Sequence, residues 1–159
     1  MIRLNSKMKD IIGDNELDIK DIAIFDYVEK NIVKKLRNIH NCIIYDPEHE
    51  IIEENINFER ILAMNGDWTG YEVSCNELTI TECINQSKLK ESIWSFRKSL
   101  QTCLHMKYPT VKFGIIISIS QEDIFLRLHT YRQEEGGWLD WNLDAYETPI
   151  MYEIMEASK

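Results

Sequence analysis

The sequence predicts an α+β domain in which an antiparallel sheet carries two long amphipathic helices packed on one of its faces. Two stretches, within residues 18–39 and 87–108, place apolar residues at intervals of three and four, as on the buried side of a helix. Residues 111–131 instead alternate apolar and polar side chains around a turn, which is the pattern of a β-hairpin. Since helices and strands do not alternate regularly along the chain, a doubly wound parallel sheet is not expected.

Residues 1–17 mix charges with short apolar pairs and end in a turn sequence, Gly-Asp-Asn. They predict either a short helix or a loosely docked arm. Asp18 then has the character of a helix N-cap, with Asp21 at the third helical position, where the helix dipole favours an acid. The helix that follows is expected to run for about five turns. Its apolar face comprises Phe25, Val28, Ile32, Leu36 and Ile39.

The region between the two long helices contains short apolar runs broken by turn residues. Residues 64–70 predict a loop, and residues 71–75 and 78–81 predict strands. The second long helix is expected to begin near residues 85–87 and to end before Pro109. Its apolar face comprises Leu89, Ile93, Phe96, Leu100 and Cys103.

The predicted hairpin consists of residues 111–119, which are apolar at every odd position, and residues 124–131 as the return strand. Residues 138–147 predict a short helix, and residues 150–155 form a last apolar segment. The chain contains no internal repeat and no low-complexity linker, so residues 1–159 are predicted to form a single domain.

The composition and charge of the chain argue against several classes of protein. The net charge of −9 works against non-specific nucleic-acid binding, because displacing phosphate counterions requires a broad basic face. No apolar run approaches the roughly 18 residues that span a bilayer, and the N-terminus lacks the apolar core of a signal peptide. The four cysteines match no zinc or haem spacing and stand among apolar residues, which indicates free thiols. A cytoplasmic protein without contact to nucleic acid or membrane is expected.

Recognisable catalytic and cofactor motifs are absent from the sequence. There is no Gly-rich phosphate loop, no exposed-serine motif and no repeated histidine ligand spacing, so no enzyme activity, cofactor or metal is expected. The alternative is a small enzyme or ligand-binding domain built on Arg127, His129, Tyr131 and Glu134, since His titrates near neutral pH and Arg can hold an anion. The same residues can instead form the water-facing side of a strand.

The C-terminal segment combines acidic and aromatic residues. Between residues 133 and 158 the chain has seven acids, two Trp and two Tyr, but no Lys or Arg. Trp and Tyr dominate the energetics of protein interfaces, and surrounding acids steer a basic partner. Trp138 and Tyr152 are expected to anchor the fold. The residues expected to bind a partner are Glu134, Glu135, Asp140, Trp141, Asp144, Tyr146 and Glu147.

The end of the chain also resembles a known type of protein. The resemblance rests on residues 126–139, Leu-Arg-Leu-His-Thr-Tyr-Arg-Gln-Glu-Glu-Gly-Gly-Trp-Leu, and residues 143–150, Leu-Asp-Ala-Tyr-Glu-Thr-Pro-Ile. Over about the last third of the chain, the pattern is similar to small bacterial immunity proteins of polymorphic-toxin and contact-dependent growth inhibition systems. This resemblance implies a small, acidic, cytoplasmic protein that neutralises a basic toxin domain, often a nuclease, by covering its active site or substrate surface. It implies no catalytic residues.

The leading prediction from the sequence is therefore an immunity protein whose acidic surface binds a basic toxin domain. A second stretch without basic residues, residues 41–59, extends the acidic field. The enzyme or ligand-binding domain is one alternative, and a homodimeric structural protein that uses the Trp-rich segment is another.

Overall fold

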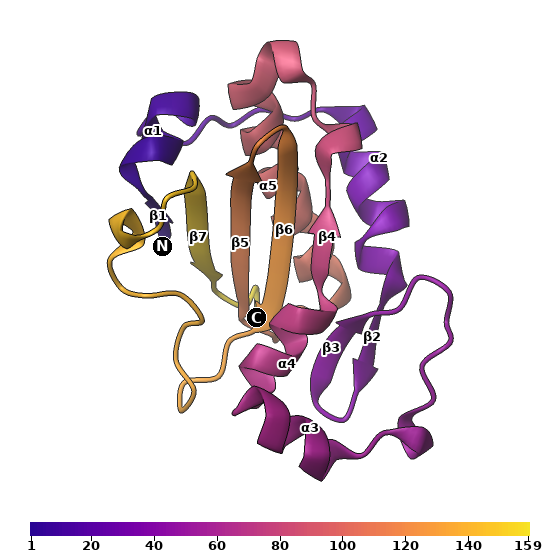
Figure 1. Ribbon diagram of the computed structural model, residues 1–159. Coiled ribbons are helices and arrows are strands. Elements are labelled where there is room, and N and C mark those ends of the chain that lie inside the picture. The colour runs from indigo at the N-terminus through magenta and orange to yellow at the C-terminus, as the bar shows by residue number, and fades with distance from the viewer.

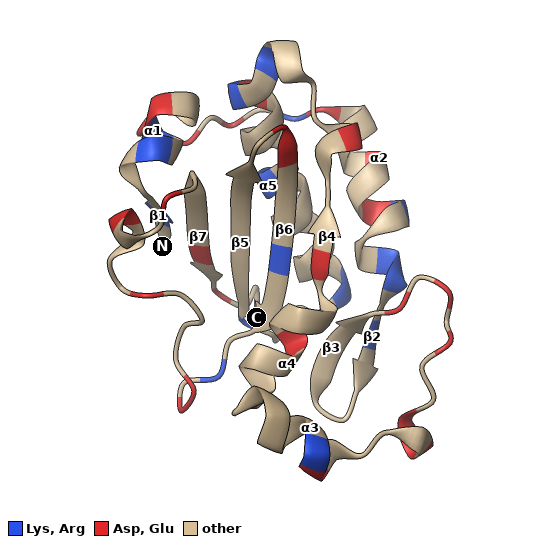
Figure 2. Cartoon of the chain, viewed as in Figure 1, with Lys and Arg blue, Asp and Glu red and all other residues tan.

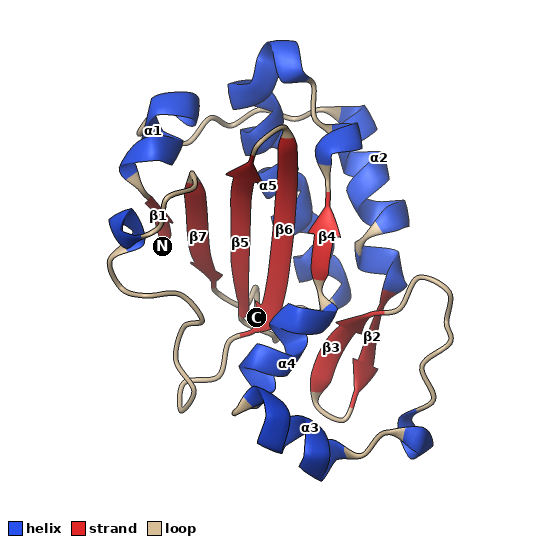
Figure 3. Ribbon diagram, in the orientation of Figure 1, coloured by secondary structure: helices blue, strands red, loops and turns tan.

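A five-stranded antiparallel sheet forms the centre of the molecule, and a two-stranded sheet lies beside it (Figure 1). The computed structural model describes residues 1–159 and confirms the predicted α+β class (Figure 3). The larger sheet has the order β1-β7-β5-β6-β4, and the smaller one pairs β2 with β3. The strands are β1 (Ile2–Leu4), β2 (Leu36–Ile39), β3 (Cys42–Tyr45), β4 (Glu77–Thr79), β5 (Phe113–Ser120), β6 (Asp123–Thr130) and β7 (Ile150–Met155).

Five α-helices surround these sheets, mainly on one side of the larger one (Figure 3). None of them combines the length and the apolar composition that a membrane crossing requires. The helices are α1 (Ser6–Ile12), α2 (Ile22–Asn31), α3 (Phe58–Asn65), α4 (Trp68–Cys75) and α5 (Leu89–Lys107).

The main core lies between the larger sheet and helices α2 and α5; in Figure 1, α5 runs behind the strands and α2 lies to the right of β4. Helix α5 begins and ends close to the predicted bounds. Most of its predicted apolar face is fully buried, and the alternate side chains of β5 and β6 complete the core. This prediction and that of the β5–β6 hairpin are therefore confirmed.

The first predicted helix is much shorter than expected. Helix α2 has ten residues, and its N-cap is Asp21 rather than Asp18. A 3-10 turn follows it, and residues 36–39, expected in the same helix, form β2. The ammonium group of Lys107 donates a hydrogen bond to the carbonyl oxygen of Leu36 at 2.6 Å. A side chain from the end of α5 thus satisfies a carbonyl that would otherwise need a further helical turn.

The N-terminal segment belongs to the folded domain. The predicted short helix is present as α1, but the alternative of a loosely docked arm is wrong. Met8 and Ile12 are fully buried in the main core. The indole N–H of Trp94 donates to the carbonyl oxygen of Ile12 at 3.0 Å, and β1 adds an edge strand beside β7.

Residues 71–75, predicted as a strand, instead belong to helix α4, which begins inside the predicted loop 64–70. Asp67 is the N-cap of this helix and accepts a hydrogen bond from the backbone N–H of Gly70 at 2.7 Å. Such a cap satisfies one of the free N–H groups at a helix start and makes the helix favourable there.

The face of the sheet opposite α5 is partly covered by residues 131–149, here called the strap, which connect β6 to β7 (Figure 1). The predicted helix in this region is wrong, because only residues 143–145 form a single 3-10 turn. Leu143 of that turn packs against Ile116, Ile150 and Tyr152 in a second, smaller core. The strap therefore has a folded inner side and an outer side that faces solvent.

Candidate protein-interaction surface

One buried side chain, Asn5, holds the strap against the N-terminal segment. Its amide nitrogen donates to the carbonyl oxygens of Leu143 at 3.3 Å and Thr148 at 2.7 Å. Its amide oxygen accepts hydrogen bonds from the backbone N–H groups of Met8 and Ile150, both at 3.0 Å. Because a single side chain joins β1, α1, the strap and β7, the strap presents its outer residues from a well-held backbone.

Trp141 is the most exposed large side chain of the strap, with an exposed fraction of 83%. The guanidinium carbon of Arg3 lies 4.9 Å from the centre of the Trp141 ring and 5.2 Å from that of Tyr152. Arg3 also donates a hydrogen bond to the carbonyl oxygen of Trp141 at 2.9 Å. A cation over an aromatic ring is attracted by the electrons of its face. Trp141 is therefore exposed, with its ring in contact with Arg3 and its backbone carbonyl group hydrogen-bonded to the same residue.

The beginning of the strap is attached to helix α4. The carboxylate of Glu135 accepts hydrogen bonds from the backbone N–H groups of Trp68 at 3.1 Å and Thr69 at 3.0 Å. An acid is favourable at this end of a helix because the helix dipole is positive there. The ring of Trp138 lies against Gly70, where an added Cβ would be only 3.2 Å from it. The Glu135 carboxylate is thus hydrogen-bonded to another part of the domain.

The residues predicted to bind a partner all lie on the strap. Tyr146 and Glu135 are half-buried, and the Tyr146 hydroxyl accepts a hydrogen bond from the backbone N–H of Asp140 at 2.8 Å. Asp144 accepts a hydrogen bond from the N–H of Ser6 at 2.7 Å, which lowers the pKa of its carboxyl. The exposed members are Glu134, Asp140, Trp141, Asp144 and Glu147.

These residues do not form one cluster. Trp141 and Asp144 line a groove of about 610 Å³ together with the basic residues Arg3 and Lys9. Glu135 and its neighbours lie at the other end of the strap, beside α4. Figure 2 shows acidic positions along the strap and along the connection from β3 to α3, with few basic ones among them. The predicted residues form an extended acidic surface on which Trp141 is the largest exposed group.

The residues of the alternative catalytic cluster are separated. Arg127 donates a hydrogen bond to Glu77 of β4 at 2.9 Å, across two paired strands. Tyr131 is half-buried, Glu134 is exposed, and His129 is fully buried. The prediction that Arg127, His129 and Tyr131 share one water-facing strand surface is therefore wrong for His129, whose ring is buried against Gly114 of β5 and Tyr152 of β7.

His129 lies directly opposite Gly114 in the sheet. A Cβ added to that glycine would come within 2.0 Å of the His129 ring, so the ring occupies the space that the missing side chain leaves. His129 Nδ1 lies 2.8 Å from the carbonyl oxygen of Thr130 and must donate to it, so Nε2 accepts from the hydroxyl of Tyr152 at 3.4 Å. Burial lowers the pKa of His129 below its usual range.

Glu72 was not predicted as a functional residue from the sequence, yet it accepts more hydrogen bonds than any other buried acid. Its carboxylate accepts hydrogen bonds from the backbone N–H of Ile43 at 2.7 Å, from the N–H and hydroxyl of Thr130 at 3.0 and 2.8 Å, and from Arg132 at 2.6 Å. It is fully buried, and Arg132 is nearly so. A buried charge requires such partners, because transfer out of water is otherwise very unfavourable.

Asn76 lies one helical turn after Glu72 and connects the same strands. Its amide nitrogen donates to the carbonyl oxygens of Ile43 at 2.7 Å and Leu128 at 3.1 Å, and its oxygen accepts from the N–H of Tyr45 at 2.7 Å. Two polar side chains four residues apart therefore link β3 of the small sheet to β6 of the large one. The four-residue spacing of Glu72 and Asn76 could have indicated this shared role, because residues four apart lie on one face of a helix.

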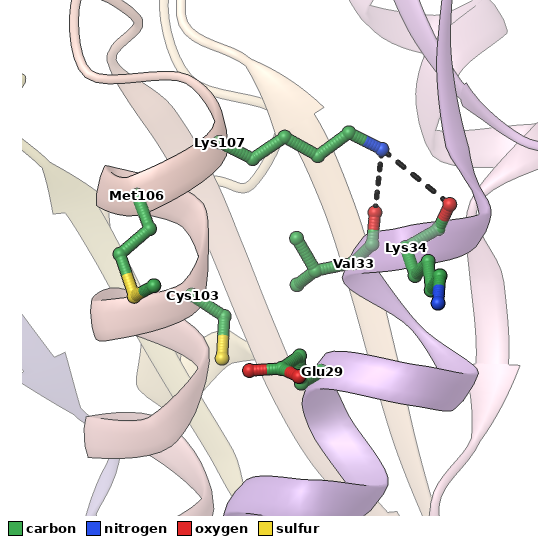
Figure 4. Close-up of a pocket in the computed structure, with 6 residues that line it drawn as sticks. All are labelled: Glu29, Val33, Lys34, Cys103, Met106 and Lys107. Carbon is green, nitrogen blue, oxygen red and sulfur yellow. Dashed lines mark hydrogen bonds between the residues drawn. The ribbon is translucent and has the colours of Figure 1, made fainter.

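A groove of about 330 Å³ between α2 and α5 offers no activated nucleophile (Figure 4). Burial raises the pKa of the Cys103 thiol to about 11, and Glu29 adds to this effect, so the thiol is neutral at physiological pH. The Lys107 ammonium points away from the groove toward the carbonyl oxygens of Val33 and Lys34 (Figure 4). No three His, Cys, Asp or Glu side chains of the molecule are grouped so that they could hold a metal ion.

Comparison with known proteins places the chain in a family. No curated protein and no solved structure matches it. The profile of the family described as "Uncharacterized protein PM0498 family" matches residues 3–159, nearly the whole chain. The chain belongs to the PM0498 family.

Proposed function

We propose that this protein is a cytoplasmic immunity protein that binds and neutralises a basic toxin domain through the outer surface of the strap. The observation that carries the proposal is the state of Trp141, which is 83% exposed but stacked on Arg3 and hydrogen-bonded through its own carbonyl group. At this exposure the tryptophan buries little apolar surface within the domain itself. Side chains of this kind dominate binding energy when a partner buries them.

The charge around Trp141 supports a basic partner. The strap carries exposed acids on both sides of the tryptophan, at Asp140 and Asp144, and further ones at Glu134 and Glu147. The segment between residues 133 and 158 contains no Lys or Arg, although Arg3 and Lys9 of the N-terminal segment lie beside Trp141 and Asp144. Exposed acids around an aromatic anchor accelerate encounter with a basic protein and disfavour acidic ones.

The support of the strap also favours binding. Asn5 and Glu135 secure its two ends to α1 and α4. A surface that is ordered before binding loses less conformational entropy when the complex forms. The enzyme alternative has less support, because Arg127 is paired with Glu77 and His129 is buried away from it.

The proposal is tested with the protein encoded by the adjacent gene. That protein is expressed in a host cell with and without this chain, growth is recorded, and the complex is titrated by calorimetry. We expect growth arrest without this chain and growth with it. Trp141→Ala should weaken binding by about 30-fold, the effect typical of an interface hot spot.

Met106→Ala is the matched control, because Met106 is also largely exposed but lies on α5, away from the strap. It should leave affinity unchanged. Absence of binding at micromolar concentration in low salt would contradict the proposed function. Equal effects of Trp141→Ala and Met106→Ala would contradict the assignment of the strap.

A further inference from the structure

Helix α3 is the one α-helix that buries none of its residues. Five of its eight residues are apolar, and three of them are more than one-third exposed: Ala63, Leu62 at 37% and Met64 at 74%. It lies at the lower edge of the molecule in Figure 1, and no other element covers its outer side. Its attachment is through aromatic stacking of Phe58 on His40, with ring centres 3.8 Å apart, and edge contact of Phe58 with Trp68.

The end of α3 lies next to the strap. A Cβ built on Gly70 would lie 3.0 Å from the carbonyl oxygen of Asn65, the last residue of α3, and 3.2 Å from the ring of Trp138. These two groups therefore flank the same point on α4. Trp138 remains 44% exposed, so the strap continues into α3 as one surface with apolar groups on it. We call Met64, next to Asn65 at the end of α3, and Trp138 of the strap the α3 patch.

The charge around the α3 patch is strongly acidic. Residues 38–87 contain ten acids and a single basic residue, Arg60. Three of the acids, Asp46, Glu72 and Glu77, form ion pairs within the domain. Of the acids within five residues of α3, Glu53, Glu54 and Glu59 are exposed and form no ion pair, whereas Asp67 is half-buried as the N-cap of α4.

The acidic charge indicates what kind of molecule can bind the α3 patch. A second copy of the chain would bring a second acidic surface against the first, and like charges across an interface are strongly unfavourable. A segment with apolar residues flanked by Lys and Arg complements both the exposed methionine and the surrounding carboxylates. Methionine is well suited to such contacts, because its flexible side chain adapts to different apolar groups.

We infer that the α3 patch is a second docking element, which binds a basic amphipathic segment of the same partner that the strap binds. The inference rests on the proposed function for the identity of the partner, but it does not depend on Trp141. The binding surface then extends from Trp141 along the strap to α3. Two linked contact regions on one partner give a stronger complex than either region alone.

A peptide probe tests the patch without the natural partner. The probe is an amphipathic helical peptide of about 18 residues, made of Leu on one face and Lys on the other. The control peptide has the same Lys residues with every Leu replaced by Gln. The full-length protein carries ¹³C-labelled methionine methyl groups and is titrated with each peptide while NMR spectra are recorded.

The six methionines provide an internal control. Met8, Met151 and Met155 are buried, whereas Met64 and Met106 are exposed to similar extents, 74% and 70%, on different sides of the molecule. We expect the Leu/Lys peptide to shift the Met64 methyl signal and not that of Met106. The Lys/Gln peptide should shift neither. Met64→Ala should weaken peptide binding by about fivefold or more, as expected for loss of a buried methionine contact, and Met106→Ala should not.

Several results would overturn the inference. These are an unchanged Met64 signal at saturation, equal shifts of Met64 and Met106, or equal effects of the two alanine variants. Concentration-dependent self-association of the free protein that Met64→Ala abolishes would identify a second copy as the occupant instead. Failure of the adjacent-gene protein to bind would contradict the proposed function alone, since the peptide titration does not involve that protein.

Discussion

The carboxylate of Glu72 accepts hydrogen bonds from both the backbone N–H and the hydroxyl of Thr130, at 3.0 and 2.8 Å. Thr130 is the last residue of β6, and the strap begins immediately after it. The same carboxylate pairs with Arg132, the second residue of the strap. Glu72 therefore determines where the sheet ends and the strap departs.

Glu72→Gln tests this role. The amide cannot accept as many hydrogen bonds and removes the closer of the two carboxylates that pair with Arg132, so we expect the free energy of unfolding to fall by about 3 kcal/mol. The matched control is Glu77→Gln, because Glu77 pairs with Arg127 at a partly exposed position. That change should cost less than about 1 kcal/mol. Urea denaturation measures both, and equal losses would contradict a special role for Glu72.

Gly114→Ala tests the packing of His129. The new Cβ would meet the buried ring at 2.0 Å, so the strand or the ring must move, and we expect a loss of about 1–3 kcal/mol in unfolding free energy. The clash disappears when the ring is removed. In the background of His129→Ala the same glycine substitution should therefore cost much less. Additive losses in the double variant would show that the ring is not what excludes a side chain at position 114.

Stability should depend on pH through His129. Burial lowers the pKa of His129 in the folded protein below its ordinary value of 6.5. Below pH 6.5 the unfolded chain therefore binds a proton that the folded chain does not bind, and the free energy of unfolding falls as pH decreases toward the folded pKa. Denaturation midpoints between about pH 7.5 and 5.5 measure this slope.

The comparison protein for this measurement is His129→Gln, which keeps a polar side chain but has no titrating group. Its stability should change less over the same pH range than that of the wild type. Parallel pH profiles for the two proteins would show that His129 does not carry the dependence.

Arg3→Leu tests whether the stacking of Trp141 matters for binding. Cation–π contacts at exposed sites contribute about 0.5–1 kcal/mol, so stability should change little. Affinity for the partner should fall by roughly threefold, because Trp141 must then be ordered on binding. Lys9→Leu removes the same charge from the same groove without touching Trp141 and should not weaken binding. If the two leucine variants bind alike, the stacking has no role.

Parts of the fold could be predicted because their patterns are local. Helix α5 keeps one apolar face over 19 residues, and β5 and β6 place an apolar residue on the core side at every second position on either side of a short turn. In both cases the side chains that decide the structure lie within the element itself. Neighbouring residues in the sequence are then sufficient to predict it.

Residues 32–39 show why other parts could not be predicted. Their apolar spacing fits a helix, but Leu36 and Ile39 are buried in two different clusters, as a strand between two layers requires. The carbonyl of Leu36 is satisfied by Lys107 and Tyr108, which are about 70 residues away in the chain. The turn to β3 holds both His40 and Asn41 in a left-handed conformation, and this pair lacks the glycine that marks most two-residue hairpin turns.

The candidate surface was predictable in composition but not in structure. The acids and aromatics of residues 133–158 indicated a binding segment, and Trp141 is indeed exposed. Glu135 instead caps α4, because its partners Trp68 and Thr69 lie in a helix that the sequence presented as a loop and a strand. The α3 patch was not predicted either, because the apolar pattern of a helix does not show whether its apolar side is buried or exposed.

The central claim is that an acidic surface on the strap binds a basic protein. Its most direct test is the salt dependence of the association rate constant with the adjacent-gene protein. The wild type is compared with a variant carrying Glu134→Gln, Asp140→Asn and Glu147→Gln. We expect a rate constant that falls steeply with salt for the wild type and weakly for the variant, with similar dissociation rates. A rate constant that responds equally to salt in both proteins would contradict it.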